Sequence, residues 1–300
     1  MLKRTITGGV IFLVTLLFVV LKQFSPLFFD AYLLLIMYGA IYEMYKVHQM
    51  SGKQADFISI CFIPLVACII FNLEKNPVKN IFYVVLIALV VMSVVLIEDI
   101  VEFRDNRKYG TTEKNINVLN QKLFLKTRTT MAVFAYPILP LLMLMVLNHI
   151  DYDLAYIGII ATFAVSMLTD TCAYFVGRFL GKTKFIPEVS PNKTIAGVFG
   201  GFAGGLIGAL SCFFLFYYTD IFALATYGSM GLLITVFILI GILGSLINQL
   251  GDLIASAYKR KYSIKDFSNI FPGHGGFMDR VDGLMFTGSF ILVLFIIFLV

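Results

Sequence analysis

Charge is scarce in this chain, and tryptophan is absent. Only 14% of the 300 residues are Asp, Glu, Lys or Arg, whereas 59% are hydrophobic, and the mean hydropathy is +0.91. A soluble domain could not hide that much apolar surface, so the composition predicts an all-α, polytopic membrane protein without a sizeable soluble domain. Without tryptophan, tyrosine and phenylalanine must supply the aromatic anchors at the membrane interface.

The common sequence signatures of metal, redox and nucleotide sites are missing as well. The four cysteines fall in apolar segments and form no C-x-x-C pair, which argues against zinc or redox chemistry. The segment GRFLGKT at 177–183 has three residues between its glycines, where a phosphate loop needs four. Glycines in the segment 195–208 recur at every fourth position, and this spacing favours close helix packing over dinucleotide binding.

Long apolar runs dominate the chain, and nine of them are predicted to cross the membrane. With a cytoplasmic N-terminus, every lysine and arginine except Lys22, Lys75 and Lys79 then lies in cytoplasmic segments, as the positive-inside rule predicts. No small-x-small cleavage site follows the first run, which is therefore predicted to be an uncleaved span. The runs cover about residues 7–21, 27–45, 57–73, 80–101, 129–148, 154–176, 195–218, 229–251 and 283–300.

A basic segment divides the chain into two parts. Residues 103–128 are charged and non-periodic, and they are predicted to form a solvated cytoplasmic connector near anionic headgroups. The N-terminal part, 1–128, carries no recognisable motif, and its acid Glu43 is interpreted as an interfacial residue beside Lys46. The C-terminal part, 129–300, holds the residues that suggest chemistry.

Polar groups gather at the ends of the last two spans, in and next to the stretch 256–282. Asp252, Ser256 and Lys259 follow one helix face, and Asp279 lies beyond the loop that follows. Two carboxylates from separate helices predict a Mg²⁺ site, and the surrounding cations predict a phosphate site. A positive loop with ion pairs would explain the charges, but not His274 between glycines. The chemical interpretation is therefore favoured.

A second polar group lies upstream. Asp170, Tyr174 and Arg178 share a helix face near the end of their span. An acid within a membrane span is either functional or paired with a neighbouring helix, and the sequence leaves both alternatives open.

These residues resemble the phosphatidate cytidylyltransferase family, the CDP-diacylglycerol synthases. The family signature is matched over 256–282 at every fixed position except Tyr258, which replaces an aliphatic residue or Phe. Upstream, DTCAYFVGRFLGK at 170–182 and SPNKT at 190–194 also match, although Ala196 stands where the family usually has Glu. The resemblance covers roughly the C-terminal half of the chain.

The resemblance implies the reaction of CTP with phosphatidate, giving CDP-diacylglycerol and pyrophosphate. It also implies Mg²⁺, a site at the cytoplasmic face of the cell membrane, and no nucleic-acid partner; a second, monovalent cation and a homodimer stay open. Together with side-chain chemistry it assigns Lys259, Arg260, Lys265, His274 and Arg280 to catalysis, Arg178, Lys193, Ser256, Asp266, Gly275 and Gly276 to substrate binding, and Asp252, Asp279 and Asp282 to the metal.

Two other functions remain as alternatives. A related CTP-dependent enzyme would act on a polyprenyl or archaeal ether lipid. A transporter would place its polar groups near the bilayer midplane on repeated, broken helices, whereas here they crowd at span ends and no repeat is visible.

Overall fold

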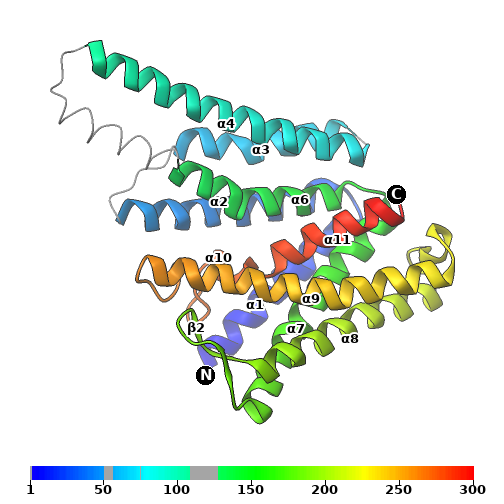
Figure 1. Cartoon of the computed structure of the whole chain (residues 1–300). Coiled ribbons are helices and arrows are strands. Elements are labelled where there is room, and N and C mark those ends of the chain that lie inside the picture. Colours follow the sequence, from blue (N-terminus) through cyan, green and yellow to red (C-terminus); the bar gives the residue numbers. More distant parts are fainter. Residues whose placement is uncertain (1, 51–56, 75, 109–127) are drawn as a thin grey trace.

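The structure, a computed structural model, describes residues 2–50, 57–74, 76–108 and 128–300. These residues form a bundle of long helices with one small antiparallel hairpin (Figure 1). The elements are α1 (Leu2–Leu21), α2 (Pro26–Met50), α3 (Phe57–Leu73), α4 (Pro77–Lys108), the π-helical turn η1 (Phe134–Ile138), α6 (Leu139–Asn148), α7 (Tyr152–Leu180), β1 (Lys184–Ile186), β2 (Ser190–Thr194), α8 (Ile195–Thr219), the 3-10 turn η2 (Leu224–Tyr227), α9 (Met230–Lys261), α10 (Met278–Val281) and α11 (Leu284–Phe298).

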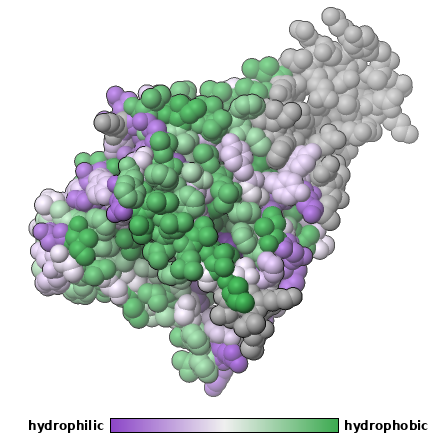
Figure 2. Space-filling model, turned by 180° about the vertical axis from the view of Figure 1, so that it is seen from behind, coloured by the Kyte–Doolittle hydropathy of each residue, from purple (hydrophilic) through white to green (hydrophobic). Residues whose placement is uncertain are grey.

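The helices are apolar enough to make this a multi-pass membrane protein, as predicted. Six helical stretches of the described residues are long and apolar enough to cross a membrane. Three shorter apolar helices, Ile6–Leu21, Ile60–Leu73 and Leu284–Phe298, coincide with the other predicted runs. That all nine cross, with the N-terminus in the cytoplasm, stays a prediction. Large apolar side chains cover much of the outer surface, as Figure 2 shows for one face.

The core of the bundle forms around α6, in which nearly every side chain is buried. It is joined by buried residues from α2, α3, α9 and α11, so both parts of the chain contribute to one apolar cluster. Helix α4 continues to Lys108, beyond the predicted end of its apolar run at residue 101, and its last turns carry charged side chains. The predicted connector at 103–128 therefore begins later than expected, and its residues 109–127 lie outside the described part of the chain.

Helices α7 and α8 pack against each other along the glycine row, which confirms the packing interpretation. A side chain at Gly204 would meet the carbonyl oxygen of Leu168, and one at Gly208 would come within 2.9 Å of the carbonyl oxygen of Ala164. Close helix contact of this kind needs small residues, since any Cβ would collide with the neighbouring backbone. The row fixes the spacing of two helices that frame the site described below.

The hairpin and the loop between α9 and α10 lie at the same end of the bundle. In Figure 1 this end is at the left, with the N-terminus below it, and the C-terminus lies at the opposite end. Between the predicted spans 154–176 and 195–218 the chain forms this hairpin, in which Lys184 pairs with Thr194 and Ile186 with Ser190.

The membrane orientation can be tested by cysteine labelling. Lys265→Cys should react only with reagents that reach the cytoplasm, and Ala225→Cys, beside the buried Leu224, only with external reagents. Labelling of whole cells with an impermeant maleimide, before and after permeabilisation, measures this against the unmodified chain. External labelling of Lys265→Cys would overturn the cytoplasmic placement of the site.

Candidate active site

The loop after α9 folds tightly because two of its glycines adopt conformations that other residues rarely take. Gly273 and Gly275 have φ values of 78° and 80°, in the left-handed region that favours glycine. These conformations let the chain reverse direction, so that Phe271 forms an antiparallel bridge with Gly275. The amide of Phe271 donates to the Gly275 carbonyl at 2.9 Å, and the amide of His274 donates to the Phe271 carbonyl at 2.8 Å. The turn that contains His274 between its glycines is thus compact.

Asp279 holds this loop in place. Its Oδ1 accepts a hydrogen bond from Lys259 Nζ at 2.7 Å. Its Oδ2 accepts from the amides of Phe267, at 2.9 Å, and Gly276, at 3.0 Å. Asp279 is buried, and a buried carboxylate is stable only when such donors replace its water. Both oxygens predicted to bind metal therefore already have protein partners.

Glu43 is a second anchor of the loop, and the sequence interpretation missed it. The side chain is fully buried rather than interfacial. Its carboxylate accepts hydrogen bonds from Ser268 Oγ at 2.5 Å and from the amides of Phe277, at 2.8 Å, and Met278, at 2.9 Å. The sequence did contain an indication of this role, because an acid within an apolar run usually has a function or a specific partner.

The two glycines predicted to let substrate approach make room for these acids. A side chain at Gly275 would meet the Asp279 carboxylate, and one at Gly276 would meet the Glu43 carboxylate. Their immediate neighbours are therefore protein groups, and the glycines allow the loop to wrap around its two anchors.

A polar cavity of about 580 Å³ opens between α7, the hairpin, α8 and α9. Of the predicted residues, Arg178, Lys193 and Asp252 line it, and Asp170 and Lys184 join them. Lys193 Nζ lies 2.7 Å from Asp252 Oδ2 and donates to the Gln249 carbonyl. The cavity thus brings together both polar groups that the sequence placed apart.

The first turn of α8 faces the same cavity. Thr194 caps this helix by accepting a hydrogen bond from the Gly197 amide at 3.1 Å, and Thr194, Gly197 and Val198 line the cavity. A helix N-terminus presents free amides and the positive end of the helix dipole, so it attracts phosphate. Together with Lys193 and Arg178, it makes this part of the cavity suited to a polyphosphate.

Three carboxylates lie near one another beside the cavity. Asp170 accepts a hydrogen bond from Asn248 Nδ2 at 2.8 Å, and its charge interacts with that of Asp252. Burial raises the pKa of Asp282, the carboxylates of Asp252 and Asp170 raise it further, and Lys259 opposes the shift. Within the described residues, no group of three or more His, Cys, Asp or Glu side chains is arranged to hold a metal by itself.

A largely apolar cavity of about 440 Å³ lies between α1 and α7, with His274 and Arg280 in its wall. Thr7 of α1 donates to the Pro272 carbonyl, which joins this helix to the loop. The charge of Arg280 also acts on Asp170, which lines the polar cavity. Arg280 therefore lines the apolar cavity, and helix α7 contributes residues to the walls of both cavities.

The remaining predicted residues lie outside both cavities. Arg260 Nε donates to the Val189 carbonyl of the hairpin at 3.3 Å, so it links α9 to the cavity wall. Lys265 and Asp266 are exposed on the loop, and Ser256 is half-buried on α9. The structure thus brings Arg178, Lys193 and Asp252 together in the polar cavity, and His274 and Arg280 in the wall of the apolar one.

The fold and the site define a helical, multi-pass membrane protein with a polar cavity, lined by basic and acidic side chains, and a largely apolar one. The model of the cytidylyltransferase family matches residues 2–298, so the chain belongs to that family.

Curated relatives match a shorter stretch. A protein named phosphatidate cytidylyltransferase from Bacillus subtilis (strain 168) is 43% identical over 155 residues, which is 50% of this chain and 51% of the relative. One from Staphylococcus haemolyticus (strain JCSC1435) is 40% identical over 138 residues, covering 46% and 48%. One from Staphylococcus aureus (strain COL) is 40% identical over 140 residues, again covering 46% and 48%. The match spans about half the length of these relatives.

Proposed function

We propose that this chain transfers a cytidylyl group from CTP to phosphatidate, giving CDP-diacylglycerol and pyrophosphate at the cytoplasmic face of the cell membrane. The observation that carries the proposal is that α7 borders both a polar cavity lined by Lys193 and Asp252 and an apolar cavity with Arg280 in its wall. A reaction between a soluble triphosphate and a membrane lipid requires a polar space and an apolar space close to each other. The family and the names of the relatives support the same reaction.

The chemistry requires no strong base. A phosphate oxygen of phosphatidate attacks the α-phosphorus of CTP, a new P–O bond forms, and the bond to the β-phosphate breaks. Pyrophosphate leaves with the electron pair. The protein must bring two anions together and stabilise the charge on the transferring group. Lys193, Arg178 and the α8 N-terminus bind the triphosphate, and Arg280 binds the lipid phosphate above the apolar cavity.

The residues present fit a Mg²⁺ ion. Mg²⁺ usually takes one or two carboxylates and completes its shell with water and substrate phosphates, so a closed protein ligand set is not needed. Asp252, with Asp170 and Asp282 beside it, would hold the ion. When bound, Mg²⁺ supplies positive charge to the phosphates of CTP. Asp279 supports the loop from its bonds to Lys259 and two amides.

A labelling experiment tests the function. Purified protein receives CTP labelled in the cytosine, together with phosphatidate, a polyprenol or an unsaturated archaeal ether lipid. We expect the label to appear only in the lipid product formed from phosphatidate, with release of pyrophosphate. Label in another lipid would assign the protein to the related enzymes, and CTP-independent flux in proteoliposomes without turnover would assign it to transporters.

Lys193→Ala should lower kcat or raise the KM for CTP by tenfold or more, about 1.4 kcal/mol. Lys193 is the cation paired with Asp252 within the polar cavity, so its loss removes charge at the site of the phosphates. Lys182→Ala, an exposed lysine of the same segment outside the cavity wall, is the matched control. If Lys193→Ala has unchanged kinetics, Lys193 does not contact the substrates, and the site is limited to the loop after α9.

A further inference from the structure

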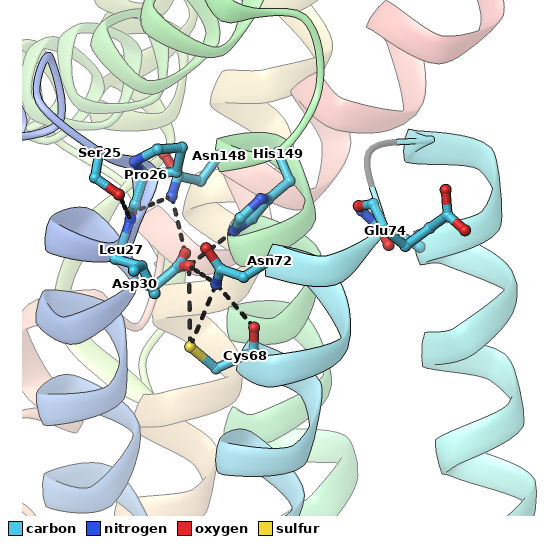
Figure 3. Close-up of polar contacts among 10 residues, drawn as sticks. Ser25, Pro26, Leu27, Asp30, Cys68, Asn72, Glu74, Asn148 and His149 are labelled. Atoms are coloured by element: carbon cyan, nitrogen blue, oxygen red, sulfur yellow. Dashed lines mark hydrogen bonds and ion pairs between the residues drawn. The ribbon is translucent and has the colours of Figure 1, made fainter.

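A second polar cluster lies on α2, far from the candidate active site. Asp30 precedes Glu43 on this helix by thirteen residues, roughly 20 Å along the axis. The Asp30 side chain is completely buried. Figure 3 shows it facing residues from α3 and α6, at the end of the bundle opposite the hairpin.

Asp30 is already fully supplied with hydrogen-bond donors. Its Oδ1 accepts from Asn148 Nδ2 at 2.8 Å, and its Oδ2 accepts from Asn72 Nδ2 and from His149 Nε2, each at 2.8 Å. These donors come from two distant places in the chain, Asn72 on α3 and the adjacent pair Asn148 and His149 at the end of α6. The carboxylate is thus stabilised without an ion pair to a lysine.

Lys22 is a buried cation in the same region. Its side chain is 2% exposed, and its Nζ lies 4.5 Å from the ring centre of Tyr156 and 5.6 Å from that of Tyr152. No carboxylate of the described residues lies within 4.0 Å of this ammonium. Burial lowers the pKa of Lys22 to about 8, and the Asp30 charge opposes the shift. Ring contacts compensate only part of the cost of burying an ammonium, so a bound anion would be favourable here.

Asn148 contributes an acceptor with no partner. The residue is 1% exposed, and its Oδ1 is buried with no hydrogen bond to any described group, while its amide nitrogen binds Asp30 and the Pro26 carbonyl. Buried oxygens of this kind are uncommon and call for a donor. Lys22 and Asn148 both line one cavity of about 420 Å³, with Ser25, Asn72, Glu74 and His149.

We propose that this cavity binds the phosphoethanolamine headgroup of a membrane phospholipid, with the phosphate at Lys22 and the ammonium at Asn148 Oδ1. The cavity lies at the ends of apolar helices, which is the level of lipid phosphates in a bilayer. It presents the Lys22 cation and the buried Asn148 oxygen that lacks a donor among the described residues, so a zwitterion matches these two groups. The Glu74 carboxylate, by contrast, is already paired with Lys79 at 3.3 Å. The proposal is independent of the reaction at the other end.

Binding of a short-chain lipid tests the site. Dihexanoyl phosphatidylethanolamine is titrated into the purified protein in a maltoside detergent, and bound lipid is measured by native mass spectrometry and by the rise in Tm. We expect saturable binding to the native chain. Lys22→Met should weaken it at least tenfold, and Lys22→Arg should restore it. Lys46→Met removes an exposed cation from the other end of α2 and should leave binding unchanged.

Changes to the ligand test the site without altering the protein. Dihexanoyl phosphatidylcholine has no N–H donor, so it should bind at least tenfold more weakly; equal binding would overturn the role of Asn148. Inorganic phosphate and glycerophosphoethanolamine should bind weakly. If either binds as tightly as the lipid, the proposal that the ligand is a membrane phospholipid is overturned. The proposal is also overturned if Lys22→Met binds the ethanolamine lipid as well as the native chain does.

Discussion

Asp252→Asn should lower kcat by roughly 100-fold or more, about 2.7 kcal/mol, and raise the Mg²⁺ concentration needed for half-maximal activity. Asp252 lines the polar cavity and lies close to the charges of Asp170 and Asp282. The amide keeps the size of the side chain but removes the anion that a hard cation prefers. Turnover of labelled CTP across a Mg²⁺ titration measures both effects, and gel filtration in detergent checks that the variant is folded.

Asp279→Asn provides the contrasting result. It should also reduce kcat, but it should lower Tm and leave the half-saturating Mg²⁺ concentration unchanged, because Asp279 anchors the loop through Lys259 and two amides. Breaking a buried ion pair in this way costs roughly 3–5 kcal/mol. Asp266→Asn, on the exposed part of the loop, should be less sensitive than either variant, because Asp266 lies outside both cavities. If Asp279→Asn shifts the Mg²⁺ response and Asp252→Asn does not, the two roles are reversed.

Glu43→Leu should reduce kcat at least tenfold and make the loop after α9 sensitive to protease, although Glu43 lies far from this loop in the sequence. The substitution leaves the Ser268 hydroxyl and the amides of Phe277 and Met278 without their acceptor. Each buried donor left unpaired costs about 1–3 kcal/mol. Kinetics and limited proteolysis of the purified variant measure the two effects.

Glu43→Gln separates positioning from simple instability. Its amide oxygen can still accept from part of this set, so it should recover part of the lost kcat and protease resistance. Glu188→Leu removes an exposed acid from the hairpin turn and should change neither quantity. Normal kinetics and an intact loop in Glu43→Leu would show that Glu43 does not position the signature.

The sequence predicted the helical fold well, because apolar runs of this length have few other structures available in a membrane. It also indicated Arg178, Lys193 and Asp252, which share one cavity in the structure. It did not predict the bonds of Asp279 or the role of Glu43. Both depend on a loop folding back onto distant helices, and helix periodicity carries no information about such contacts.

The cluster around Lys22 and Asp30 escaped prediction for a related reason. Its members are separated by long stretches of chain, and each alone resembles an ordinary residue at a helix end. Only the packing of α2 against α3 and α6 brings them together. The signature at 256–282 could be found from the spacing of residues within one segment. The residues around Lys22 and Asp30 come from different segments, so no such spacing exists.

The glycine row between α7 and α8 also determines which walls of the polar cavity can move. Where backbone touches backbone, no side chain can rotate to absorb a displacement, so these two helices must move as one rigid piece. The hairpin, by contrast, is linked to α9 through side-chain contacts: the ion pair of Lys193 with Asp252, the bond from Lys193 to the Gln249 carbonyl and the bond from Arg260 to the Val189 carbonyl. For the proposed reaction, we therefore expect exchange of CTP and pyrophosphate to break these side-chain contacts, while α7 and α8 stay packed together.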